Sequence, residues 1–383
     1  MKIIHTADWH IGKILNERSL LEEQGPMLHA WVDEVKKIAP DAIIMAGDLY
    51  DRSLPSQEAV HLVHQILKRL ALEVACPTLM ISGNHDSGQR LAYLQELLAH
   101  FDLYIEGLPR QQVKRVTVKE ADIYLFPYTD YGPLKALYPE EDIHSLPAGV
   151  AAQLATCREL WRPERLNLAV FHGYVTRHDL LAQEAGEDLV YSEQARPLTI
   201  GTQPYIPSAY FADFSYVALG HLHQCQQVGH APMYYSGSPF SYSKAEAGQR
   251  KVYLEVDLER DGVTVKKHPF PAKRTVKIAR GSFKELLAQG SDDYVYLELT
   301  DEKPVHEAMA RLLVAYPRAL SLSYVQLARE REQVALHSKE CLAKLSQESL
   351  FQRFYQEMTA QELTAYQEKL VRQAFQAARE EAK

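Results

Sequence analysis

Long apolar runs and clustered cysteines are both missing from this sequence. No stretch approaches the roughly 18 apolar residues that a membrane-spanning helix needs. The opening residues also leave no room for a basic segment followed by a long apolar one, so we expect a soluble, cytoplasmic protein with no membrane partner. The four cysteines are scattered without a Cys-x-x-Cys pair, which excludes a disulfide-stapled miniprotein and argues against a zinc finger.

A basic excess is also absent, since the formal net charge is −8 over 383 residues. Proteins that bind DNA unaided usually carry a strong positive charge, so any nucleic-acid role here must use a local patch, a metal site or a partner. The sequence contains no Gly-x-x-x-x-Gly-Lys-Ser/Thr loop, which argues against an ATPase of that type. Hydrophobic residues make up 46% and charged residues 24%, values of an ordinary globular protein rather than a disordered one.

Short β-rich runs recur along residues 1–270, with amphipathic segments between several of them. Their apolar continuity predicts strands buried on both faces. The expected strands are Lys2–His5, Asp41–Ala46, Thr78–Ser82, Ile123–Pro127, Leu166–Phe171, Tyr216–Leu219, Met233–Ser236 and Lys251–Asp257. The expected helices are Pro26–Ile38 with proline at its first position, one capped by Ser56, and one over Leu91–Phe101. This alternation predicts a layered α/β fold.

The pattern changes near residue 272. Residues 273–335 alternate three expected strands with two expected helices and form a small α/β unit. Residues 340–383 are rich in charge and contain two expected helices, the second opened by a capping box at Thr359 and Glu362. We therefore expect three domains, 1–272, 273–335 and 340–383.

Residues that commonly bind metals directly follow the expected strands in five segments. These are His5–His10, Gly47–Arg52, Gly83–Asp86, His172–Gly173 and Gly220–His223. Each segment alone has an ordinary reading as a turn or as surface, but five of them in this order are hard to explain by accident. Carboxylates mixed with imidazoles suit Mn²⁺, Fe²⁺ or Zn²⁺ rather than the oxygen ligands of Ca²⁺.

This ordered set closely resembles the calcineurin-like metallophosphoesterases. Asp-Trp-His-Ile-Gly at residues 8–12, Gly-Asn-His-Asp-Ser at 83–87 and Tyr-Ser-Gly-Ser-Pro at 235–239 resemble the nuclease subunits of bacterial SbcC–SbcD complexes. The resemblance covers essentially the whole chain. It implies a layered α/β/β/α sandwich over residues 1–272 that carries the nuclease site. It further implies a small α/β capping domain that binds DNA and a C-terminal helix-loop-helix that docks a partner.

The same resemblance implies two divalent metal ions, with Mn²⁺ as the expected metal. The first ion would be held by Asp8, His10, Asp48 and His223. The second would be held by Asp48, Asn84, His172 and His221. Asp48 would bridge the two ions. Such a pair makes water a nucleophile near neutral pH and neutralises a phosphodiester.

Further site residues lie beside these ligands. His85 is expected to stabilise or protonate the leaving oxygen, and a carboxylate should orient its imidazole, with Asp51 and Asp86 as the two candidates. Candidate DNA contacts are Arg52, Lys266, Lys267, Lys273 and Arg274. The last four belong to a basic strip that could follow a phosphate backbone, although an ordinary solvated face explains it equally well.

These features predict a metal-dependent DNA nuclease. The resemblance implies an ATP-dependent double-strand exonuclease and a single-strand or hairpin endonuclease in DNA repair, recombination and replication. It would act as a homodimer of nuclease subunits bound to two SbcC-type ATPase chains with coiled coils. One alternative is a stand-alone phosphatase on small molecules or phosphoproteins, which leaves the small domain and the tail unexplained. The other is a non-catalytic scaffold, which has no need of seven metal ligands.

Overall fold

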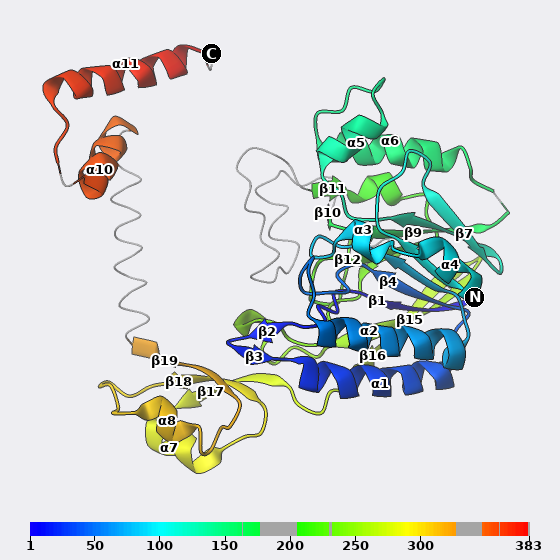
Figure 1. Ribbon diagram of the computed structural model, residues 1–383, viewed down its shortest axis with the longest axis horizontal. Coiled ribbons are helices and arrows are strands. Elements are labelled where there is room, and N and C mark those ends of the chain that lie inside the picture. The colour runs from blue at the N-terminus through cyan, green and yellow to red at the C-terminus, as the bar shows by residue number, and fades with distance from the viewer. Residues whose placement is uncertain (163, 177–204, 230–231, 327–346, 360, 382–383) are drawn as a thin grey trace.

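Two six-stranded sheets face each other, and helices cover their outer faces (Figure 1). The computed structural model describes residues 1–162, 164–176, 205–229, 232–326, 347–359 and 361–381. From one face to the other the layers are helix, sheet, sheet and helix, which confirms the expected α/β/β/α sandwich.

The first sheet has the strand order β16-β15-β1-β4-β5-β6. Four of its strands run parallel: β1 (Lys2–Thr6), β4 (Ala42–Ala46), β5 (Thr78–Ile81) and β6 (Leu103–Glu106). The hairpin of β15 (Val252–Glu259) and β16 (Gly262–Pro269) adds to β1 in the antiparallel direction. The sequence pattern did not reveal β6 or β16, because both contain polar residues typical of a sheet edge.

The second sheet has the order β13-β14-β12-β9-β8-β7, and four of its strands also run parallel. Its parallel strands are β8 (Ala121–Phe126), β9 (Leu166–His172), β12 (Tyr216–Gly220) and β14 (Met233–Tyr235). Antiparallel edges are formed by β7 (Lys114–Val118) and β13 (Gln226–Gln227). Two further pairings join β2 (Ile14–Leu15) to β3 (Arg18–Ser19) and β10 (Tyr174–Thr176) to β11 (Tyr205–Pro207).

Helices α1 (Leu21–Ile38) and α2 (Gln57–Arg69) cover the first sheet, while α5 (Tyr131–Leu137) and α6 (Leu146–Arg158) cover the second. Ser56 caps α2 as expected, because its hydroxyl accepts from the backbone N–H of Ala59. Helix α1 begins five residues earlier than expected, so Pro26 lies inside it. The start follows Leu20 rather than proline, and Glu22 and Glu23 supply negative charge to the first turn.

The helix expected over Leu91–Phe101 is broken into α3 (Gly88–Leu91) and α4 (Gln95–Leu98). Leu94 between them adopts φ 62°, a left-handed conformation that ends a helix. Short helical turns occupy Leu70–Val74, Ala99–Phe101, Ser208–Phe211 and Lys244–Glu246.

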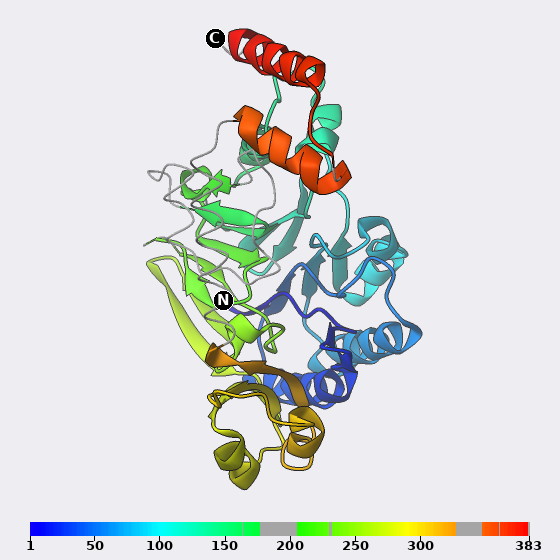
Figure 2. The same cartoon turned by 90° about the vertical axis from the view of Figure 1, so that its left-hand side faces the viewer.

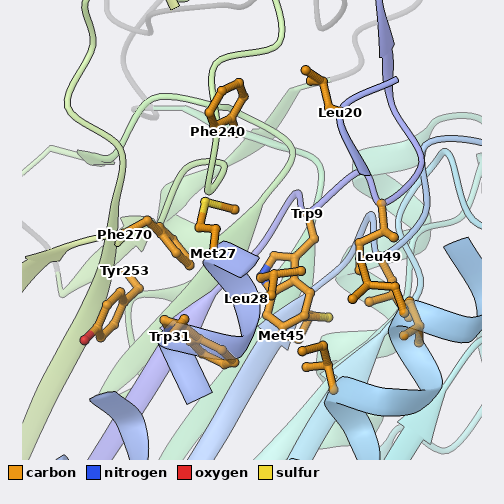
Figure 3. Packing of buried hydrophobic residues seen from close by; sticks show 14 of the residues in the cluster. Trp9, Leu20, Met27, Leu28, Trp31, Met45, Leu49, Phe240, Tyr253 and Phe270 are labelled. Atoms are coloured by element: carbon orange, nitrogen blue, oxygen red, sulfur yellow. The ribbon is translucent and has the colours of Figure 1, made fainter. Parts of the chain in front are cut away.

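Apolar side chains hold the layers together. Between α1, α2 and the first sheet, Trp9 and Trp31 pack edge to face at 5.1 Å, and Met45 and Phe270 belong to the same cluster (Figure 3). A second cluster lies between the sheets and joins strand residues of both. The tight core leaves the ends of the strands as the place where polar loops meet.

A separate three-stranded parallel sheet follows the sandwich. It contains β17 (Val276–Gly281), β18 (Tyr294–Leu299) and β19 (Ala319–Tyr324), with α7 (Phe283–Gln289) and α8 (Ala308–Leu312) as crossovers. The alternation expected after residue 272 is therefore confirmed in kind and order. Arg274 anchors this unit to the sandwich through an ion pair with Glu23 at 2.5 Å.

The tail consists of α10 (Gln347–Thr359) and α11 (Ala365–Glu381). The expected capping box at Thr359 is wrong, since Thr364 and Gln367 form the reciprocal pair at the start of α11. Both helices lie apart from the three-stranded sheet in the two views (Figures 1 and 2). The expected boundary at residues 335–340 lies outside the described residues. Within the described residues, no helix is long and apolar enough to cross a membrane.

Candidate metal centre

Every expected metal ligand lies at or just beyond the carboxyl end of a central parallel strand. Asp8 and His10 follow β1, Asp48 follows β4 and Asn84 follows β5. In the second sheet, His172 ends β9, and His221 and His223 follow β12. Ligand sites of α/β sheets form at this edge, and here the two sheets place their edges together, so seven residues from distant segments meet.

The backbone at these residues is held in unusual conformations. Asp8, His10 and Asp48 have φ angles of 54°, 44° and 52°. Backbone bonds tie the loops to each other, because the N–H of Asp8 donates to the carbonyl of Gly47 and that of His10 to the carbonyl of Asp48, both at 3.0 Å. Left-handed conformations at residues other than glycine cost about 1–3 kcal/mol each and gather at functional sites.

Glycine is required where the loops touch. A Cβ atom added at Gly83 would overlap the carboxylate of Asp48, and one added at Gly47 would overlap the ring of His172. Gly47 also has φ +92°, which side chains rarely adopt. The glycines therefore let three loops approach closely enough for their side chains to share one site.

The first cluster of donors contains Asp8, His10 and His223, with one donor atom of each within 4.8 Å of the others. The Nε2 atoms of His10 and His223 lie 3.1 Å apart and both are buried. Two imidazole lone pairs at this distance repel unless a proton or a cation lies against them. The donor set of one carboxylate and two imidazoles fits a divalent transition metal.

The second cluster contains Asp48, His172 and His221, again within 4.8 Å. The amide oxygen of Asn84 lies 2.9 Å from Nδ1 of His221 and 3.1 Å from Nε2 of His172. Among the residues that the structure describes, the buried Nε2 of His221 finds no hydrogen-bond partner. Oδ2 of Asp48 lies 3.6 Å from Nε2 of His10 and 3.5 Å from Nε2 of His172, the position of a carboxylate that bridges the two clusters.

Hydrogen bonds on the opposite ring nitrogen set the orientation of two histidines. Nδ1 of His172 donates to the carbonyl of Ala46 at 2.7 Å, and Nδ1 of His223 donates to Glu246 at 3.1 Å. In both rings this turns Nε2 toward the cluster, as in metal-binding histidines generally. The residues present therefore fit two metal ions.

Burial favours the neutral form of two imidazoles, since it lowers the pKa of His10 to about 4 and places the pKa of His221 well below its usual value. Burial opposes the charge on His172 too, but the Asp48 carboxylate outweighs it and raises the pKa of His172 to about 9. Burial opposes the charge on Asp48 as well, yet the adjacent imidazoles, His172 foremost, hold the pKa of this carboxyl well below its usual range. Neutral imidazoles and an ionised carboxylate are the protonation states that metal binding needs.

His85 lies at the rim of the two clusters, with its ring edge to face against His10 at 4.7 Å. Its Nδ1 donates to the backbone carbonyl of Asp51 at 2.9 Å, and its backbone N–H donates to Asp48 at 2.8 Å. The expectation that a carboxylate orients this ring is therefore wrong. The backbone carbonyl of Asp51 accepts from the ring instead.

Both candidate carboxylates have other partners. Oδ1 of Asp51 accepts from the ammonium of Lys13 at 2.8 Å and lies 3.5 Å from Nδ1 of His10. Donor atoms of His10, Asp51 and His85 also lie within 4.8 Å of one another. The positive charge of Lys13 disfavours a third metal ion among them. Asp86 accepts backbone N–H bonds from Leu49, Tyr50 and Gly83, and thereby pins two loops of the site together.

The expected DNA contacts are not brought together as a continuous strip of free cations. Lys266 pairs with Glu255 and Asp257, because these residues face it across the β15–β16 hairpin. Arg274 pairs with Glu23 and Asp292. Lys267 lines a cavity of about 290 Å³ beside His223. Lys273 is exposed, and Arg52 is exposed but lies 3.8 Å from the carboxylate of Asp51. The acidic partners lie outside the basic strip in the sequence. The sequence of the strip therefore suggested more unpaired positive charge than the folded protein has.

Sequence reasoning missed two residues of this centre. Lys13 follows the Asp-Trp-His-Ile-Gly segment directly, and its proximity to that segment was the available signal. Glu246 lies eight residues after Ser238, and no pattern links it to His223, from which it is separated by 23 residues.

Comparisons with known proteins agree with this geometry. Residues 1–225 match the calcineurin-like phosphoesterase family, and residues 273–359 match the Type 5 capsule protein repressor C-terminal domain. The chain is 32% identical over 387 aligned residues to SbcD, the D component of the SbcCD nuclease, from Staphylococcus saprophyticus, covering 100% of this chain and 99% of the relative. A solved dimetal phosphatase from Danio rerio aligns with 71% of this chain and 97% of its own length, with a TM-score of 0.42 and 10% identity. The chain therefore belongs to the SbcD family of nucleases, within the calcineurin-like phosphoesterases.

Proposed function

We propose that this nuclease hydrolyses DNA phosphodiester bonds at a site for two divalent ions, as the nuclease subunit of an SbcC–SbcD-type complex. The observation that carries the proposal is the convergence of two donor clusters on one shared carboxylate, Asp48. Two such ions would activate a water molecule and neutralise the charge of the phosphodiester. The similarity to the staphylococcal relative over the full length supports the same role for this chain.

The chain's own residues supply the remaining chemistry. Asp8, His10, Asp48 and His223 would hold one ion, and Asp48, Asn84, His172 and His221 the other. His85 would stabilise or protonate the leaving oxygen, since the carbonyl of Asp51 fixes its Nδ1 and leaves Nε2 for proton transfer. Mn²⁺ suits these sites better than Mg²⁺, because Mg²⁺ favours oxygen ligands and retained waters over imidazole.

The tail would dock a coiled-coil ATPase of the SbcC type. The sequence has no phosphate-binding loop of its own, so energy from ATP must come from a partner. The two helices expose an apolar face: Leu350, Phe351, Phe354, Met358, Tyr366 and Leu370. Exposed apolar groups of this size mark protein-binding surfaces. ATP-dependent exonuclease action on duplex ends and ATP-dependent endonuclease action on hairpins would depend on this docking, whereas basal Mn²⁺-dependent cleavage by the isolated chain would not. The unit of residues 273–335 would cap the nuclease domain of residues 1–272 and contact DNA, with residues 340–383 as the docking segment.

A second copy of the chain would cover another apolar patch. Around α3 and α4, the exposed fractions of Tyr93, Leu94, Leu97 and Phe101 are 72%, 48%, 58% and 64%. A homodimer through this patch would give a heterotetramer with two ATPase chains. Light scattering of the isolated chain should report twice the mass of 43.6 kDa. The Leu97→Asp variant should be strictly monomeric, because it places a charge in this patch. A monomeric unaltered chain would contradict the dimer.

Cleavage of labelled duplex and hairpin DNA tests the function, with a small phosphatase substrate in parallel and with or without the ATPase. We expect no DNA cleavage in chelator, recovery with Mn²⁺ above that with Mg²⁺, and digestion of duplex ends only with the ATPase and ATP. Full activity in chelator would contradict the two-metal site. Rapid hydrolysis of the small substrate without DNA cleavage would instead identify a stand-alone phosphatase.

A further inference from the structure

A buried carboxylate lies directly behind one of the metal-site histidines. Glu246 closes the helical turn Lys244–Glu246, and its side chain is 3% exposed. Its Oε1 lies 3.1 Å from Nδ1 of His223 and accepts from the hydroxyl of Ser243 at 3.0 Å. An ionised carboxylate only accepts, so His223 must carry its proton on Nδ1. The Nε2 lone pair is then free, and it faces Nε2 of His10 at 3.1 Å.

A buried lysine holds this arrangement from the other side. The ammonium of Lys251 donates to Oε2 of Glu246 at 2.6 Å and to the backbone carbonyl of His223 at 2.9 Å. It also contacts the hydroxyl of Ser238 at 3.1 Å, and its side chain is only 10% exposed. Lys251 thus neutralises Glu246 and also contacts the backbone of His223, whose ring Glu246 orients.

Stability alone gives little reason for a buried ion pair at this place. Removing two charges from water is costly, and apolar residues of similar volume are often as stable or more so. Another buried carboxylate, Asp122, lies near the start of β8 and ties a loop through ion pairs with Arg162 and Arg165. The Glu246 pair, by contrast, touches both the ring and the backbone of a metal-site histidine.

We infer that Glu246 and Lys251 are positioning residues that fix the tautomer and the ring orientation of His223 for metal binding. The inference rests on the proposed two-metal site. Partners of this kind behind a metal ligand typically contribute 10–100-fold to metal affinity. The loss should fall on the ion held with Asp8 and His10, because His223 belongs to that cluster, and spare the ion held by His172 and His221.

Titration of the full chain with Mn²⁺, with free ion followed by electron paramagnetic resonance, tests the inference. Glu246→Leu combined with Lys251→Met removes the acceptor without leaving either charge unpaired. Glu246→Gln combined with Lys251→Met restores a neutral acceptor in the same place. Asp122→Asn is the matched control, since it weakens a buried ion pair away from the site. Thermal unfolding of every chain in chelator reports the structural effect separately.

The Leu/Met chain should bind one Mn²⁺ normally and the other 10–100-fold more weakly. The Gln/Met chain should recover part of that loss, and Asp122→Asn should bind both ions normally even where it melts earlier. Equal Mn²⁺ affinity of the Leu/Met and unaltered chains would overturn the inference. An equally large loss of Mn²⁺ affinity in Asp122→Asn would also overturn it. If the Leu/Met chain does not fold, Glu246→Gln/Lys251→Met decides, because unchanged affinity and unchanged pH dependence of binding would assign the pair a structural role only. An unaltered chain that binds fewer than two ions would instead contradict the proposed function.

Discussion

At the scale of single residues, neighbouring histidines in this site have different environments. His10 is fully buried, its pKa is lowered to about 4, and its Nε2 faces another ring nitrogen. His85 lies 4.7 Å from it, ring to ring, but is only partly buried and is held through a carbonyl. A neutral buried imidazole is suited to hold a metal, whereas an open one with a fixed Nδ1 can exchange a proton with a substrate.

Substitution of His85 should separate chemistry from metal binding. His85→Ala keeps the backbone N–H that donates to Asp48, so both ions should remain bound. Loss of proton transfer to the leaving oxygen should slow cleavage roughly 10²–10⁴-fold. Asp48→Asn should instead lose metal, because it weakens the shared ligand. Metal content and single-turnover DNA cleavage check this, with the exposed His61→Ala as control. An empty His85→Ala chain beside a fully loaded Asp48→Asn chain would reverse the two assignments.

At the scale of elements, strands and helices have different tasks. Central parallel strands end at one edge and carry the site on short loops whose backbone is strained at Asp8, His10 and Asp48. The tail helices instead leave apolar side chains exposed, although Phe351 of α10 contacts Phe375 of α11 at 6.4 Å between ring centroids. Two short helices cannot bury both of their apolar stripes against each other, so a face remains for a partner.

Disruption of that face should remove the partner and spare the chemistry. Phe354 is 58% exposed in the middle of α10, and Phe354→Asp should weaken ATPase binding by roughly 30-fold, the loss typical of a central apolar contact. Mn²⁺-dependent cleavage by the isolated chain should not change. Co-purification and ATP-dependent digestion measure the effect, with Gln356→Asp on the same helix as control. Binding at full strength would contradict docking through this apolar face.

At the scale of the whole molecule, the two sheets must stay in register for their loops to meet. His5 on β1 contributes to this, because its Nδ1 accepts from the hydroxyl of Tyr216 on β12 at 2.9 Å and its Nε2 donates to the carbonyl of Leu219 at 3.2 Å. Burial, opposed in part by the bond to Leu219, lowers the pKa of His5 to about 3. The ring therefore bridges the sheets in its neutral form.

Acid should weaken the sandwich through this residue. The unfolded chain binds a proton at His5 below about pH 6.5, whereas the folded chain does not until about pH 3. Stability is therefore present above pH 6.5 and is lost as the pH falls, by about 2 kcal/mol between pH 7.5 and 5.0. Urea unfolding in chelator should show this extra loss in the unaltered chain relative to His5→Gln. The exposed His144→Gln variant should lose as much free energy of unfolding as the unaltered chain. Equal dependence of the free energy of unfolding on pH in all three chains would refute the role of His5.

Much of this architecture follows from local pattern. Apolar runs followed by Gly, Asp, Asn or His predicted eight strands and the loops that carry seven metal-type residues. Both predictions succeed because strand burial and loop composition depend on residues that are neighbours in the sequence. The alternation of strands and helices after residue 272 was predicted from the same local pattern. The helix over Leu91–Phe101 was not, since its apolar spacing hid a break at Leu94 where the backbone turns left-handed.

Only the tertiary structure decided which residues serve which others. The acceptor for His85 is the carbonyl of Asp51, a group that no side-chain pattern reveals. Lys266 and Arg274 looked free until folding brought acidic partners from other strands and helices against them. Glu246 reaches His223 across 23 residues of chain. Hydrogen bonds and ion pairs depend on proximity in space. The sequence alone therefore determined the layers and which metal-type residues follow the strands, while the packed fold determined the orientation and charge of those residues.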